Sequence, residues 1–222
     1  MSALRRLAAE GLGTALLLAT IIGSGIMGEQ LAGGNAALAL IANALATGAG
    51  LIALILAFGP VSGAHFNPLV SIAEATRNGL RWREVPLYIG AQIAGAYAGT
   101  AAAHLMFAKP LYFASRHTRA GWPMIWSELV ATFGLLCVIL ATSRTRPAAA
   151  PFAIGAYITA AYWFTASTCF ANPAVTLARA ASDTFAGIRP DDVPGFLAAQ
   201  TAGCIAALVL SAWLFPRGNA TR

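Results

Sequence analysis

The chain has 222 residues, of which 58% are hydrophobic and only 10% are charged, and its mean hydropathy is +0.69. Soluble domains carry about 25% charged residues, so this composition excludes an ordinary globular surface and predicts a polytopic membrane protein. The net charge of +6 does not indicate a nucleic-acid partner, because the basic residues stand singly between apolar stretches. The three cysteines have neither metal-site nor disulfide spacing, and we expect no metal site and no cofactor.

Six apolar stretches approach the length of about 20 residues that a membrane-spanning helix needs. They cover approximately residues 7–27, 37–58, 86–107, 123–142, 151–167 and 194–215. The cluster Gly59-Pro60 and Ser62-Gly63 is expected to end the second span. The first span lacks a small-residue cleavage site, so we expect it to be retained and not removed as a signal peptide.

Two shorter segments begin with an Asn-Pro step. The first starts at Asn67-Pro68-Leu69 and reaches about residue 77, and the second starts at Asn172-Pro173-Ala174 and reaches about residue 182. Asn is a preferred N-cap, and Pro is tolerated in the first helical turn. We therefore predict two re-entrant half-helices, and such a pair in a membrane chain indicates a transport site near the bilayer midplane.

The basic residues predict the orientation. With a cytoplasmic N-terminus, nine bases would lie inside: Arg5, Arg6, Arg77, Arg81, Arg83, Arg144, Arg146, Arg217 and Arg222. Four would lie outside: Lys109, Arg116, Arg119 and Arg189. This excess favours cytoplasmic N- and C-termini in a multi-pass protein of the cell (inner) membrane, with the half-helices entering from opposite sides.

Two motifs occur once in each half of the chain. Glu-x-x-x-Thr begins at Glu10 and Glu128, and Gln-x-x-Gly begins at Gln92 and Gln200. Each half has an odd number of spans, which forces opposite topologies. The pattern therefore predicts an inverted repeat.

The order of these motifs around two Asn-Pro segments resembles the aquaporin (major intrinsic protein) family over nearly the whole chain. The resemblance implies an all-α membrane fold with six transmembrane helices and two half-helices that meet tip to tip beside a pore. It implies one channel domain over residues 1–222, with repeats over about 1–110 and 120–222. It also implies one pore per subunit of a homotetramer in the lipid bilayer. A membrane enzyme would need a nucleophile or metal cluster, and none converges in the sequence.

The loops before the half-helices are expected to offer carbonyl acceptors to a passing solute. The expected ladder consists of Gly63, Ala64, His65, Phe66, Thr168 and Phe170. Asn67 and Asn172 would add side-chain N–H donors, and both half-helices would point their positive dipole ends to the same place. A small neutral solute could exchange its water hydrogen bonds for these groups, whereas a cation would meet a positive field. Asn67 and Asn172 could instead serve only as helix caps.

Glu10 and Glu128 allow two interpretations. Carboxylates inside a membrane indicate function by default, and a proton relay would make the protein an ion-coupled secondary transporter. The family resemblance instead implies that each carboxylate accepts hydrogen bonds from the loop before a half-helix.

The selectivity filter departs from the common family pattern. Counted from the Asn residues, its four positions fall on Thr47, Ala160, Cys169 and Val175. Most members place Arg where Val175 stands, so we expect a wider opening with a lower positive barrier. This resembles bacterial aquaglyceroporins associated with arsenic resistance, which implies passage of arsenite, methylated arsenicals, glycerol and water. The alternative is a general water and small-polyol channel with no arsenic role.

Arg179 lies seven residues after Asn172, and Glu74 lies seven residues after Asn67. Seven helical steps return to nearly the same face. Arg179 could therefore place a charge at the outer mouth of the pore. Both side chains could instead be ordinary helix-end charges that extend to water.

Overall fold

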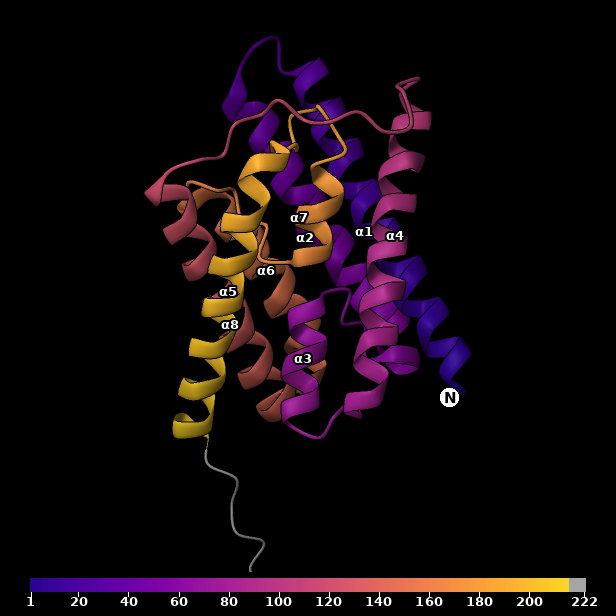
Figure 1. Cartoon of the computed structure of the whole chain (residues 1–222), viewed down its shortest axis with the longest axis vertical. Coiled ribbons are helices and arrows are strands. Elements are labelled where there is room, and N and C mark those ends of the chain that lie inside the picture. The colour runs from indigo at the N-terminus through magenta and orange to yellow at the C-terminus, as the bar shows by residue number, and fades with distance from the viewer. Residues whose placement is uncertain (216–222) are drawn as a thin grey trace, which may run out of the picture.

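The computed structural model describes residues 1–215, and helices form all its regular elements in that range (Figure 1). The α-helices are α1 (Ala3–Leu31), α2 (Ala36–Ser62), α3 (Pro68–Thr76), α4 (Val85–Met106), α5 (Trp122–Thr145), α6 (Ala150–Phe164), α7 (Pro173–Arg179) and α8 (Val193–Leu214). Single 3-10 turns precede α4, α6 and α8: η1 (Trp82–Glu84), η2 (Pro147–Ala149) and η3 (Pro190–Asp192). By length and composition, α1, α2, α5 and the segment Pro190–Leu214 could each cross a membrane.

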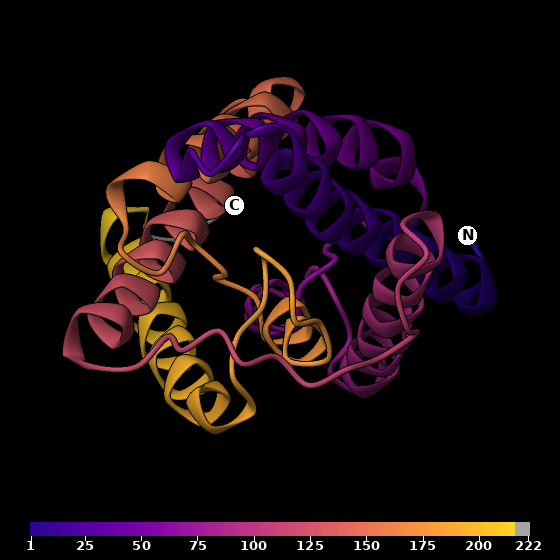
Figure 2. The same cartoon turned by 90° about the horizontal axis from the view of Figure 1, so that it is seen from above.

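The six long helices form an arc, and the two short helices fill the gap between α4 and α8 (Figure 2). In Figure 1, α3 occupies the lower half of the molecule and α7 the upper half, and their N-terminal ends meet near the middle. The chain begins at the lower end, where α8 also ends. Arg217 and Arg222, which entered the charge count, lie outside the described residues.

Glycines set the closest helix contacts. A Cβ atom at Gly95 or Gly99 of α4 would overlap the backbone of α1 at Gly11 or Ala15. Gly203 of α8 lies in the same way against the Leu129 carbonyl of α5. Small residues let helices approach inside a membrane, where packing has to replace the hydrophobic effect.

Two predicted boundaries were wrong. The helix α2 continues through Gly59 and Pro60 to Ser62, and it ends only where Gly63 adopts the left-handed conformation, with φ +92°. The helix α6 ends at Phe164, three residues earlier than expected, because Thr165 is extended. This earlier end leaves more chain for the loop before α7.

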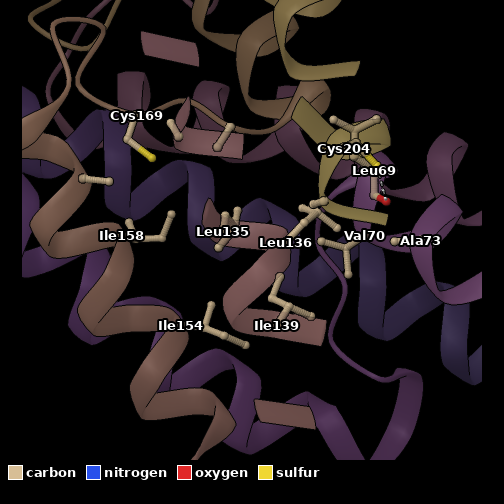
Figure 3. Packing of buried hydrophobic residues seen from close by; sticks show 14 of the residues in the cluster. Leu69, Val70, Ala73, Leu135, Leu136, Ile139, Ile154, Ile158, Cys169 and Cys204 are labelled. Atoms are coloured by element: carbon tan, nitrogen blue, oxygen red, sulfur yellow. Dashed lines mark hydrogen bonds between the residues drawn. The ribbon is translucent and has the colours of Figure 1, made fainter. Parts of the chain in front are cut away.

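A buried apolar cluster holds α3 against the second half of the chain (Figure 3). Leu69 and Val70 of α3 belong to the same cluster as Leu135 of α5 and Ile158 of α6. Large apolar side chains also cover the outer surface; Trp213, for example, is 75% exposed. A chain with apolar residues on both faces of its helices fits a lipid environment.

An ion pair fixes the start of α1. The Arg6 guanidinium lies 2.6 Å from the Glu84 carboxylate in η1. Hydrogen bonds from Arg6 hold the pKa of the Glu84 carboxyl below its usual value. This pair ties the N-terminus to the segment that leads into α4.

Candidate functional site: a solute pathway between the half-helices

Both Asn-Pro steps begin a helix as the sequence predicts. Asn67 caps α3, with its Oδ1 accepting a hydrogen bond from Leu69 N at 2.9 Å. Asn172 caps α7, with its Oδ1 accepting from Ala174 N at 3.0 Å and from Val175 N at 3.4 Å. Pro68 and Pro173 occupy the first helical position, where their missing N–H costs no intrahelical bond.

The two Asn side chains also join the halves of the chain. Asn67 Nδ2 donates to the carbonyl of Ala171 at 2.8 Å, and Asn172 Nδ2 donates to the carbonyl of Phe66 at 2.7 Å. An amide nitrogen carries two hydrogens. Each Asn therefore keeps a second N–H beyond this crossed pair, and capping alone does not account for the arrangement.

The backbone of both loops is held in an uncommon conformation. Ala64 and Phe66 have positive φ in the first loop, and Thr168, Cys169 and Ala171 do in the second. Such a conformation costs a non-glycine residue about 1–3 kcal/mol and persists only where the surroundings enforce it. The loops therefore need strong external support.

Glu10 supplies this support to the first loop. Its Oε1 accepts from Ser62 Oγ at 2.6 Å and from His65 N at 2.9 Å. Its Oε2 accepts from Phe66 N and from Gln92 Nε2, both at 2.8 Å. Four donors therefore satisfy one fully buried carboxylate.

Glu128 repeats the arrangement in the second loop. Its Oε1 accepts from Ser167 Oγ at 2.6 Å and from Phe170 N at 2.9 Å. Its Oε2 accepts from Ala171 N at 2.9 Å and from Gln200 Nε2 at 2.6 Å. Because all of these partners are donors, the carboxylates have the geometry of loop supports and not of a proton relay.

A cavity of about 740 Å³ runs past both Asn side chains. Gly79 and Ala148 line it at one end, and Arg179 lines it toward the other. One wall is apolar and includes Ile154 and Ile158 of α6. A pathway with an apolar wall and a few polar groups suits small solutes that carry both kinds of surface.

The expected carbonyl ladder lies along this cavity with one exception. The residues of the ladder that line the cavity are Gly63, Ala64, His65, Phe66 and Phe170. Thr168 is not among them, and its Oγ1 instead lies 3.4 Å from Nη1 of Arg119. This contact involves the Thr168 side chain and not its backbone carbonyl, so the place of Thr168 in the ladder stays a prediction.

Three of the four expected filter residues line the cavity: Thr47, Cys169 and Val175. The assignment of Ala160 was wrong, because Ala160 lies on the exposed face of α6. Tyr162 is buried in its place, and its hydroxyl lies 3.2 Å from Thr47 Oγ1. Counting back from Asn172 gave the wrong helical phase, because the inward face of α6 follows the i, i+4 series of Ile154, Ile158 and Tyr162.

Positive charge is present near the filter despite Val175. The Arg179 guanidinium is buried, lies over the Phe170 ring at 3.3 Å from its centroid, and lines the cavity. Arg119 comes from the loop between α4 and α5, and its guanidinium lies 5.0 Å from the same ring centroid. Positive charge therefore remains at this end of the cavity, and the lower positive barrier expected from Val175 stays a prediction.

The model of the major intrinsic protein family matches residues 1–169 of the chain. The chain belongs to the major intrinsic protein family. It is 54% identical to the aquaglyceroporin AqpS of Rhizobium meliloti (strain 1021), over 95% of this chain and 90% of that protein. It is 31% identical to the aquaporin NIP2-3 of Zea mays, over 83% of this chain and 62% of that protein.

The fold has a match among solved structures. The X-ray structure of the aquaglyceroporin from Plasmodium falciparum superimposes with a TM-score of 0.71 at 23% identity, over 96% of this chain and 95% of that one. As a major intrinsic protein, this chain is a multi-pass membrane channel for small neutral solutes and not an enzyme. Among the residues that the structure describes, no cluster of His, Cys, Asp or Glu could hold a metal ion.

Sequence reasoning missed several residues of this channel. Ser62 and Ser167 each stand five residues before an Asn-Pro step, so the repeated spacing could have revealed them. Finding Tyr162 would have required knowing which face of α6 points into the cavity. Arg119 lies in a polar loop with no motif around it, and no sequence signal pointed to its buried position.

Proposed function

We propose that this major intrinsic protein is a passive channel of the cell (inner) membrane that conducts water, glycerol, arsenite and methylated arsenicals. The observation that carries the proposal is the cavity that passes the crossed pair of Asn67 and Asn172. Each amide keeps an N–H to offer a hydroxyl oxygen, so a neutral solute can replace part of its hydration while it passes.

Val175 supports the wider range of solutes. Val175 lines the cavity three residues after Asn172, at the position where most members of the family carry an Arg side chain. Arsenite is an uncharged triol at neutral pH, and its hydroxyl groups can meet the same donors and carbonyl acceptors as those of glycerol. The similarity to a protein named aquaglyceroporin also favours solutes larger than water.

Val175→Arg tests the solute range. In proteoliposomes, the added side chain should fill part of the cavity and lower glycerol and arsenite flux about tenfold or more, which corresponds to a barrier of about 1.4 kcal/mol. Water flux should fall much less. Val175→Leu is the matched control for added bulk without charge, and unchanged glycerol and arsenite flux in Val175→Arg would contradict the filter assignment.

Two other functions give different results in the same assay. A general water and small-polyol channel would conduct glycerol but exclude arsenite. A secondary transporter would show saturable flux that depends on an ion gradient, whereas a channel follows the solute gradient alone. The structure favours the channel, because Glu10 and Glu128 use both carboxylate oxygens to hold the loops.

We also propose one channel domain with inverted repeats over about 1–110 and 120–222, cytoplasmic termini and a homotetramer. The matched supports at Glu10 and Glu128 favour the repeat. Exposed apolar side chains on α1 and α2, such as Leu31 and Leu45, offer surface for lipid or a neighbouring subunit. Native mass spectrometry from detergent would give the oligomeric state, and a monomer would contradict the tetramer.

A further inference from the structure

We infer that Arg179, with the hydroxyl pair of Thr47 and Tyr162, forms the outer solute-binding constriction of this channel, one helical turn beyond Val175. The inference rests on the proposed function as a channel for neutral hydroxylated solutes. These three residues bind the solute and exclude cations, a role that the Arg side chain at the Val175 position would otherwise have.

The placement of Arg179 follows from the geometry of α7. Arg179 lies four residues after Val175, which is about one turn and about 6 Å further along the helix axis. Asn172, Val175 and Arg179 all line the same cavity. A charge one turn further along therefore still faces the pathway.

Burial excludes an ordinary helix-end charge. Arg179 is 1% exposed, whereas a charge that only completes a helix end extends to water. Its Nε donates to the carbonyl of Ala186, and its plane rests on the Phe170 ring. The side chain is thus fixed from two sides.

One nitrogen of this fixed guanidinium has no partner. Arg179 Nη1 is buried and makes no hydrogen bond with the part of the chain that the structure describes. A buried charged donor without an acceptor is unfavourable. Because the side chain lines the cavity, an oxygen of a passing solute is the acceptor that fits it.

Thr47 and Tyr162 provide the complementary polar group. Their hydroxyl oxygens lie 3.2 Å apart, so one donates to the other and the second hydroxyl hydrogen remains for another acceptor. Both residues are buried and line the cavity together with Arg179. A polyol or triol that passes through this cavity can therefore meet both a charged donor and a hydroxyl group.

Arg119 does not share this role. Its Nε donates to Gly187 O at 2.7 Å, its Nη1 to Ser167 O at 3.0 Å and its Nη2 to Phe185 O at 3.4 Å. Every nitrogen of the guanidinium is thus engaged with the outer loops. Arg119 adds positive field at Phe170 and holds the loops, while Arg179 keeps the free donor.

Arg179→Gln tests the inference in proteoliposomes. Removing a buried positive charge beside the pathway should raise methylammonium influx about tenfold or more, since a unit charge a few Å away acts strongly at intermediate dielectric. Glu74→Gln is the matched control, because Glu74 follows Asn67 by the same seven residues and lines the cavity as well. It should leave methylammonium excluded as in the wild type.

The outcomes separate the two proposals. No glycerol flux through the wild type would end the proposed function. If the wild type conducts glycerol but a folded Arg179→Gln variant still excludes methylammonium, only this inference is overturned. An equal rise of methylammonium influx in Glu74→Gln would also overturn it. If Arg179→Gln does not elute as a folded species, the double variant Thr47→Val/Tyr162→Phe decides. It should lower the ratio of glycerol to water flux about threefold, the effect of one lost hydrogen bond, and an unchanged ratio would overturn the inference.

Discussion

Replacing Glu128 with Gln should destabilise the whole protein, because this change removes one of the two acceptors that hold the second loop. Oε2 of Glu128 accepts from Ala171 N and from Gln200 Nε2, and Oε1 accepts from Ser167 Oγ and from Phe170 N. A Gln side chain keeps one oxygen, and its NH₂ group can only donate. Two of the four hydrogen bonds therefore lose their acceptor.

The magnitude follows from these two bonds. A hydrogen bond to a charged group contributes about 1.5–3 kcal/mol, so the variant should lose about 3–6 kcal/mol of unfolding free energy. For a chain of this size, each kcal/mol lowers the melting temperature by about 2–4 °C, which gives a fall of at least about 6 °C. The positive φ values of Cys169 and Ala171 make the loop more dependent on this support.

Thermal unfolding of the purified protein in detergent measures this loss. Glu29→Gln is the matched control, because it makes the same Glu-to-Gln substitution at an exposed position on α1. Glu10→Gln should behave like Glu128→Gln, since Glu10 supports the first loop in the same way. If Glu128→Gln melts within about 2 °C of the Glu29→Gln control, less than the shift from 1 kcal/mol, the support role is refuted.

Two further predictions concern packing and access. Gly99→Leu should lower the free energy of unfolding by at least about 1–3 kcal/mol, because the new side chain overpacks against the α1 backbone at Ala15. Gly90→Leu is the control and should be tolerated, because there is open space around Gly90. Equal melting temperatures for the two variants would contradict the α1–α4 packing. A mercurial should block solute flux by reacting with Cys169, which lines the cavity. The Cys169→Ser variant should conduct and resist the block, whereas the control variant Cys137→Ser should stay sensitive. Wild-type flux that the mercurial leaves unchanged would rule out Cys169 as an accessible pore residue.

The features that depend on local chemistry could be predicted from the residues alone. Asn67-Pro68 and Asn172-Pro173 begin helices because Asn satisfies the first free N–H groups and Pro loses nothing in the first turn. The long helices could be predicted because a membrane-spanning helix requires a long stretch of apolar residues. The family resemblance implied that Glu10 and Glu128 support the two loops, and these carboxylates do accept the loop N–H groups.

Which side chains meet at the end of the cavity near Arg179 could be learned only from the folded arrangement. Ala160 and Tyr162 differ by two residues, but this rotates the side chain by about 200° around the helix, and the sequence does not mark where α6 stops. Arg119 and Arg179 meet at Phe170 because a loop folds back over α7. Such contacts join residues far apart in the chain, and they depend on packing and not on any local preference.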